Sequence, residues 1–157
     1  MTHASRRLAA IFSLALVASF AVWAAQEPAL TYRVEVNPGD IALAANPAAD
    51  AAPLNETIVF TVTNSSNLDY KGIAPSCKTF DVEIFRADPS GEKSVWKWSQ
   101  GRAYCQMVTT VRIRAGESWQ QAVKWTFAAA SVQPGKYRVA ATFVPSHSEA
   151  SATFEIH

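Results

Sequence analysis

Residues 57–63, with the sequence TIVFTVT, decide the fold class of this 157-residue chain. Ile58, Phe60 and Val62 fall on one face of an extended segment, and threonines occupy much of the other. An apolar residue at every second position is the pattern of a strand that buries one face and exposes the other. The segment therefore predicts a half-buried β-strand.

The same alternation recurs along the chain on both sides of this segment. Strands are predicted at 30–36, 57–63, 79–86, 94–99, 108–114, 118–127, 137–143 and 152–156. Pro-Gly, Asn-Ser and Asp-Pro-Ser-Gly turns separate them, and residues 39–55 are interpreted as a surface connection. No helical period follows residue 29. Short, evenly spaced strands of this kind predict an all-β fold, which we interpret as an immunoglobulin-like antiparallel β-sandwich.

Composition excludes several classes of protein. Fourteen basic residues face thirteen acidic ones, so the net charge of +1 provides no field for binding nucleic acid. Charged residues make up 17%, which is sparse for a coiled coil or a disordered acidic tail. The hydrophobic share of 49% provides the material for a packed core.

The first residues are interpreted as a targeting signal. His3, Arg6 and Arg7 precede a nearly uncharged apolar stretch at 8–25. This layout predicts a signal peptide over residues 1–24, cleaved after Ala24. The chain is then exported, periplasmic or extracellular, with no membrane contact after cleavage; an uncleaved anchor is the alternative, since the stretch is about long enough to span a bilayer. Residues 25–55 would hold the first strand and an Ala/Pro-rich loop, and residues 56–157 the remainder of one domain.

Cys77 and Cys105 are the only cysteines. In an oxidising compartment the natural interpretation is a disulfide, placed as a staple between two loops at one end of the sandwich. Two buried free thiols are the alternative. We predict no metal site, because His147 and His157 lie outside ligand spacing from the cysteines.

Catalysis is not predicted, and no cofactor is expected. His147 adjoins Ser146, Ser148 and Glu149, but residues in one turn do not form a catalytic triad without the matching geometry. The tryptophans at 96, 98, 119 and 125 could form a platform for a sugar or peptide. Because they fall on alternating strand positions, a packed core is favoured over a platform.

Several short motifs, in order, resemble the BsuPI family. They include Thr61-Val62-Thr63-Asn64, Ala74-Pro75-Ser76 and the Pro134-Gly135-Lys136-Tyr137 turn, and the most specific is Trp96-Lys97-Trp98-Ser99. The residues that carry the resemblance are Asn64, Ser76, Phe80, Asp81, Trp96, Trp98, Ser99, Tyr104, Gln106, Gly116, Trp125, Gly135 and Tyr137.

The resemblance covers about residues 56–144 and implies one immunoglobulin-like β-sandwich. By the family's name, taken from an intracellular proteinase inhibitor, it also implies inhibition of a serine proteinase. Cys77 stands where the family usually has glycine, and Cys105 where it has threonine. This paired change suggests that the two positions lie close together, and it fits relocation outside the cell.

The partner is therefore predicted to be a protein, with a serine proteinase as the candidate. The candidate contact loop contains Gly101, Arg102, Ala103 and Tyr104, because a trypsin-like pocket would accept arginine and a bridge at Cys105 would stiffen the loop. Docking through an unpaired edge strand is a second mode. The competing function is an accessory immunoglobulin-like module that binds cell-envelope proteins or glycans.

Overall fold

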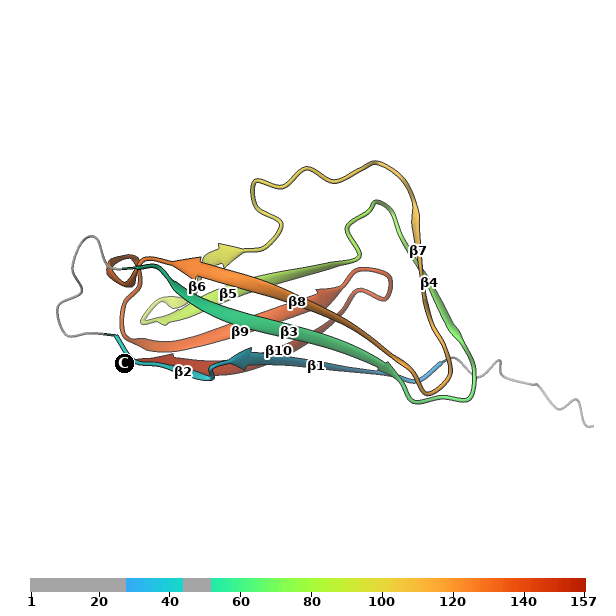
Figure 1. Ribbon diagram of the computed structural model, residues 1–157, viewed down its shortest axis with the longest axis horizontal. Helices are drawn as coiled ribbons and strands as arrows, with labels where there is room; N and C mark the ends of the chain where they lie inside the picture. The colour runs from blue at the N-terminus through green and yellow to red at the C-terminus, as the bar shows by residue number, and fades with distance from the viewer. Residues whose placement is uncertain (1–27, 44–51) are drawn as a thin grey trace, which may run out of the picture.

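The computed structural model describes residues 28–43 and 52–157, and these residues form an elongated β-sandwich (Figure 1). The predicted signal peptide at 1–24 lies outside the described residues, as do residues 44–51 of the predicted surface connection. Within the described part of the chain, no helix is long and apolar enough to cross a membrane.

The fold is built from ten strands. In chain order they are β1 (Leu30–Asn37), β2 (Asp40–Ile41), β3 (Leu54–Asn64), β4 (Tyr70–Ala74), β5 (Phe80–Asp88), β6 (Gly91–Lys97), β7 (Thr109–Ile113), β8 (Ser118–Phe127), β9 (Gly135–Phe143) and β10 (Ser148–Ile156). The 3-10 turn η1 (Ala129–Ser131) is the only helical element in the described ranges. The all-β prediction is confirmed, while its assignment to the immunoglobulin type stays a prediction.

Two sheets face each other across the core. One holds β1, β3 and β8 in that order, and the other holds β2, β10, β9, β5 and β6. The pairings are antiparallel except for the two-residue pairing of β2 with β10, which is parallel and departs from the purely antiparallel prediction. The reason is that the chain changes sheets after β1, so β2 arrives beside β10 in the same direction.

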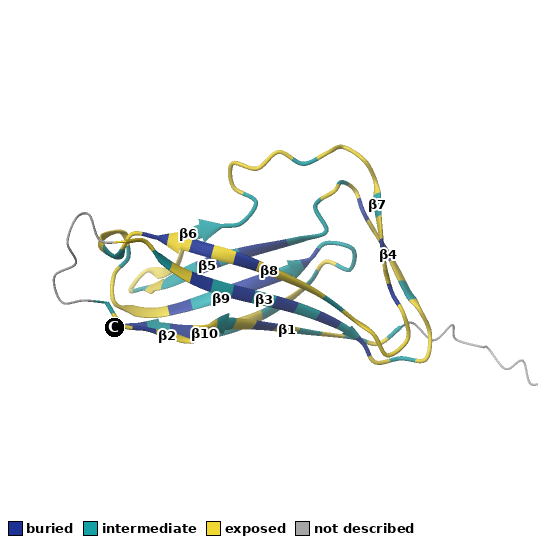
Figure 2. Ribbon diagram, in the orientation of Figure 1, coloured by how far each residue is buried: buried dark blue, intermediate teal, exposed yellow. Residues whose placement is uncertain are grey.

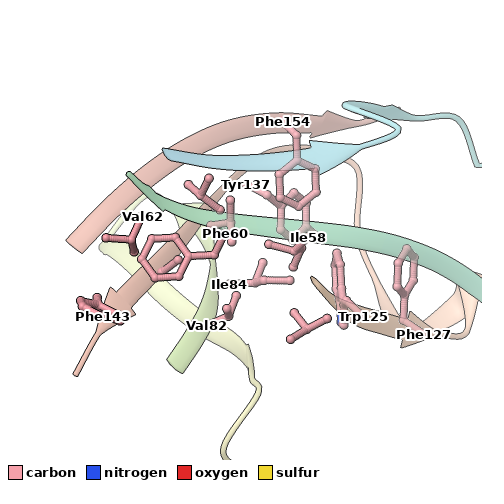
Figure 3. Packing of buried hydrophobic residues seen from close by; sticks show 14 of the residues in the cluster. Ile58, Phe60, Val62, Val82, Ile84, Trp125, Phe127, Tyr137, Phe143 and Phe154 are labelled. Atoms are coloured by element: carbon pink, nitrogen blue, oxygen red, sulfur yellow. The ribbon is translucent and has the colours of Figure 1, made fainter. Parts of the chain in front are cut away.

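The core lies on the face of β3 that the alternating sequence pattern predicts to be buried. Ile58, Phe60 and Val62 are almost fully buried and face Val82 and Ile84 of β5 (Figure 3). Full burial of each such side chain contributes about 1.5 to 3 kcal/mol. The predicted inward face of β3 is therefore confirmed. Its packing against β5 stabilises the contact between the two sheets.

The tryptophans belong to the core and do not form an exposed platform. Trp125 is buried, and Trp96, Trp98 and Trp119 are partly buried against the core cluster. The distances from their ring centroids to those of neighbouring aromatic rings run from 4.1 Å, between Trp125 and Phe127, to 6.5 Å, between Trp96 and Trp125. All four rings belong to the core cluster or pack against it, which supports the core interpretation.

The buried face of β3 also contains a carboxylate that the pattern did not predict. Glu56 is 3% exposed, and its Oε2 atom has no hydrogen-bond partner among the described residues. Burial raises the pKa of Glu56 above its ordinary value of 4.5, because a low dielectric disfavours the charged form. The folded state therefore loses some stability as the pH rises through that higher pKa.

A two-stranded ribbon of β4 and β7 closes one end of the sandwich (Figure 1). β4 was missed at the sequence level because its five residues, YKGIA, contain a glycine and lack clear alternation. The ribbon continues the β3–β8 ladder past a corner. There the Asn64 amide donates to the Glu117 carbonyl and the Gly116 amide donates to the Asn64 carbonyl, both at 2.9 Å. We call residues 65–79 and 98–117, which leave and rejoin the two sheets, the arm.

The corner is fixed by Asn64, whose side chain is fully buried. Its Nδ2 donates to the carbonyls of Leu68 and Ile113 at 2.7 and 3.0 Å, and its Oδ1 accepts from Ser66. Opposite it, Gly116 has a φ of +75°, a conformation that glycine adopts without strain. These two family-motif residues therefore set the angle of the arm.

Candidate functional site

A disulfide joins the two outer loops of the arm. Cys77 lies in the loop between β4 and β5, and Cys105 in the segment between β6 and β7. Their Cα atoms are 5.4 Å apart, and the Cys77 amide donates to the Cys105 carbonyl at 3.3 Å. The predicted bridge between two loops is confirmed.

Asp81 anchors both loops to the sandwich. The alternation of the predicted strand at 79–86 predicts that Asp81 is exposed to water, and this is wrong, since the residue is only 8% exposed. The side chain leaves the sheet on the outer face, but the loops cover it: Ser99 donates to it through Oγ at 2.6 Å and through its amide at 3.1 Å. Lys78, the neighbour of Cys77, places Nζ 2.5 Å from Asp81 Oδ2. One carboxylate thus holds the end of the β4–β5 loop and the start of the segment that follows β6.

The charge of Asp81 is stabilised by these contacts. Burial alone would raise its pKa, but hydrogen bonds from Lys78 and Ser99, together with the charge of Lys78, outweigh that effect. The pKa of Asp81 therefore lies below its ordinary value of 3.8. Charge-assisted hydrogen bonds of this kind are stronger than neutral ones, so the anchor is firm at neutral pH.

The predicted contact loop begins with a tight turn. The Arg102 amide donates to the Ser99 carbonyl at 3.1 Å, and Gly101 has a φ of +73° inside the turn. Gly101, Arg102 and Ala103 are exposed, as a contact loop requires. At residues 99–102 the chain folds back on itself and is not extended.

The Arg102 side chain lies against Trp98. Its guanidinium carbon is 3.4 Å from the ring centroid, and its Nε donates to the Trp98 carbonyl at 2.8 Å. This is a cation–π contact that also covers the outer side of the tryptophan. To enter a pocket of a partner, Arg102 would have to leave that ring.

Tyr104 completes the packing between the loops. Lys78 Nζ lies 5.9 Å above its ring, and its hydroxyl is buried with no hydrogen-bond partner among the described residues. The Ser76 hydroxyl accepts a hydrogen bond from the Lys78 amide at 3.1 Å, while Gln106 is exposed. Sequence reasoning missed Lys78, because a lone lysine after a cysteine carries no recognisable signal.

The remaining motif residues lie in the body of the fold. Phe80 packs on Trp98 and Trp119, Trp96 on Trp125, and Trp125 on Tyr137, while Gly135 begins β9. The aromatic residues among them pack in or against the core, while Gly135 is exposed. The motif therefore divides into residues that build the core or the corner and residues that anchor the outer loops.

No reactive constellation is found in the described ranges. An open groove of about 940 Å³ beside β4 is lined by residues that include Tyr32, Tyr70 and Ser146, with a hydrogen bond of 2.9 Å between the hydroxyls of Tyr32 and Ser146. His147 is exposed in the β9–β10 turn and does not line this groove. In the described part of the chain, no three His, Cys, Asp or Glu side chains could hold a metal ion.

Comparison with known families agrees with the arrangement of these motifs. The sequence model described as BsuPI, intracellular proteinase inhibitor, matches residues 43–148, about two thirds of the chain. The chain belongs to the BsuPI family. The resemblance predicted from the sequence is confirmed, and an inhibitor family agrees with a partner that is a protein and with the expectation of a non-catalytic role.

No curated protein matches this BsuPI-family chain. Among solved structures, a β-glucosidase from Erythrobacter marinus is similar with a TM-score of 0.46 and 12% identity, over 83% of this chain and 16% of the enzyme. A CARDB domain from Pyrococcus furiosus, solved with two metal ions, is similar with a TM-score of 0.44 and 16% identity, over 83% of this chain and 94% of that domain. The sporulation control protein Spo0M of Bacillus subtilis is similar with a TM-score of 0.43 and 10% identity, over 82% of this chain and 48% of Spo0M. Likenesses at this level carry no argument about function.

Proposed function

We propose that this BsuPI-family protein is an exported inhibitor of a serine proteinase that contacts its target through the loop at residues 101–104. The observation that supports this most is the exposed loop held at both ends, by Asp81 on one side and by the disulfide on the other. A loop fixed before binding loses less entropy on docking and is harder to cleave. A loop of this kind is what a proteinase inhibitor requires.

Export is supported by the apolar segment at 8–25 and by the disulfide, because such bonds persist in oxidising compartments. The family description names an intracellular inhibitor, and this chain departs from that description through its two cysteines. N-terminal sequencing of protein recovered from the periplasm or medium tests the proposal. We expect a first residue of Ala25; a chain that keeps its N-terminus and stays in the cytoplasm contradicts export.

Inhibition is tested with the mature protein and a panel that includes trypsin and subtilisin. We expect saturable inhibition at a one-to-one ratio. If Arg102 occupies a trypsin-like pocket, Arg102→Ala should weaken inhibition of trypsin at least 10-fold, because a buried, charge-recognised side chain is lost from the contact. Arg33→Ala is the matched control, since Arg33 is an exposed arginine on β1, outside the arm.

Two outcomes contradict parts of this proposal. Equal inhibition by Arg102→Ala and the wild type removes Arg102 from the contact but keeps the inhibitory function. No inhibition of any proteinase in the panel, combined with capture of cell-envelope components, favours the accessory module over the inhibitor.

A further inference from the structure

The β4–β7 ribbon has one covered face and one open face. Gly72 and Ala74 of β4 are buried, as are Val111 and Ile113 of β7, so this face closes the end of the sandwich. The residues that alternate with them, Lys71, Ile73, Thr110 and Arg112, are exposed. We call these four side chains, together with Pro75 and Val108, the outer face of the arm. Buried and exposed residues alternate along β4 and β7 (Figure 2).

The outer face has an apolar centre. Of the five large hydrophobic side chains exposed among the described residues, four lie on the arm: Leu68, Ile73, Met107 and Val108. Ile73 and Val108 are each 63% exposed. Ile73 pairs with Thr110, so Val108 falls diagonally across from it on the same face. Apolar side chains gathered in this way on a water-facing surface are typical of a protein contact.

The arm is also more basic than the rest of the chain. It holds five basic residues, Lys71, Lys78, Arg102, Arg112 and Arg114, and two acidic residues, Asp69 and Glu117. The other described residues hold seven basic and nine acidic side chains. Lys71 makes no ion pair within the described ranges, while Arg112 binds Asp69. Elsewhere on the arm, Lys78 binds Asp81 and Arg114 pairs with Glu117, so Lys71 carries the unpaired positive charge beside the apolar centre.

This surface is held in place before any partner arrives. The disulfide closes its outer end, and the buried Asn64 side chain fixes its inner end. The contact loop at 101–104 belongs to the same arm, and the disulfide at Cys105 joins that segment to the loop that follows β4. A second copy of the chain is a poor occupant, because two basic faces would repel each other.

We infer that the outer face of the arm binds an acidic, apolar-centred surface of the target proteinase, next to the site that meets the contact loop. This inference rests on the proposed inhibitory function and adds the chemistry of the partner's second contact. Positive charge around the apolar centre raises the association rate with an acidic partner, and the apolar centre lowers the dissociation rate. Inhibition should therefore weaken as the salt concentration rises.

The test uses matched substitutions on the arm and on β6. Val108→Asp is compared with Val95→Asp, because Val95 is an exposed valine, 42% accessible, on β6 and outside the arm. Lys71→Glu is compared with Lys93→Glu, another exposed lysine on that strand. The inhibition constant is measured for the most strongly inhibited proteinase of the panel, at low and high salt, and thermal unfolding checks that each variant folds.

We expect Val108→Asp and Lys71→Glu to weaken inhibition at least 10-fold at low salt, and the two β6 variants to change it less than 2-fold. Lys71→Glu should also reduce the dependence on salt. Arm variants that inhibit as well as their β6 controls overturn the inference while the inhibitory function stands. A wild-type protein that inhibits nothing overturns the function, and the inference with it. If the wild type is a dimer and Val108→Asp is a monomer, the outer face binds a second copy of the chain, and the inference is also overturned.

Discussion

Replacing both Cys77 and Cys105 by serine is expected to lower the free energy of unfolding by roughly 3 to 4 kcal/mol. The bond closes a loop of 28 residues, and the chain-entropy model assigns a cross-link of that length a stabilisation of this size. Both cysteines are exposed, so serine introduces no buried polar group. The loss is a large share of the 5 to 15 kcal/mol that a domain of about this size has. Urea denaturation of the oxidised wild type and of the variant measures it.

The control for this prediction is the wild type after reduction. The reduced wild type and the double serine variant should unfold at the same urea concentration, because neither has the cross-link. Trypsin should also cut both of them after Arg102 faster than it cuts the oxidised protein, since the loop has lost its outer anchor. If the oxidised wild type and the variant unfold at the same urea concentration, the bridge does not constrain the unfolded chain as proposed.

The strands of the sandwich could be predicted because their signal is local. In β3 and β8 the apolar residues sit at every second position, so the buried face follows from the sequence alone. β4 carries no such signal. Its strand conformation comes from pairing with β7, a partner about 40 residues away, and from the corner at Asn64. Pairing over that distance leaves no pattern in a five-residue segment.

The candidate site was predictable only in part, for the same reason. Compartment chemistry predicted the disulfide, and the loop at 101–104 followed from its neighbour Cys105. The burial of Asp81 could not be predicted, because alternation places it on the solvent face of β5, and only the loops from Lys78 and Ser99 cover it. The Arg102–Trp98 contact likewise depends on a turn whose shape is set by Gly101.

Asp81→Asn is expected to lower the free energy of unfolding at pH 7 by about 2 to 3 kcal/mol. The substitution keeps the size of the side chain, but it removes the charge that Lys78 and Ser99 contact, and breaking a largely buried charged network is costly. Glu83→Gln is the matched control on the same strand. Its ion pair with Lys97 is more exposed, so we expect a loss below about 1 kcal/mol.

The pH dependence of unfolding separates the charge of Asp81 from its shape. Because the folded protein lowers the pKa of Asp81, the stabilisation is complete above the ordinary value of 3.8 and is lost as the pH falls through the lower folded value. The wild type should therefore lose its advantage over Asp81→Asn in strong acid, where both side chains are neutral. The variant should also inhibit more weakly at pH 7, since the loops that meet the partner lose their common anchor. A difference in stability that stays constant from pH 7 down to pH 2 would mean that Asp81 acts through packing, and that its ion pair with Lys78 contributes nothing.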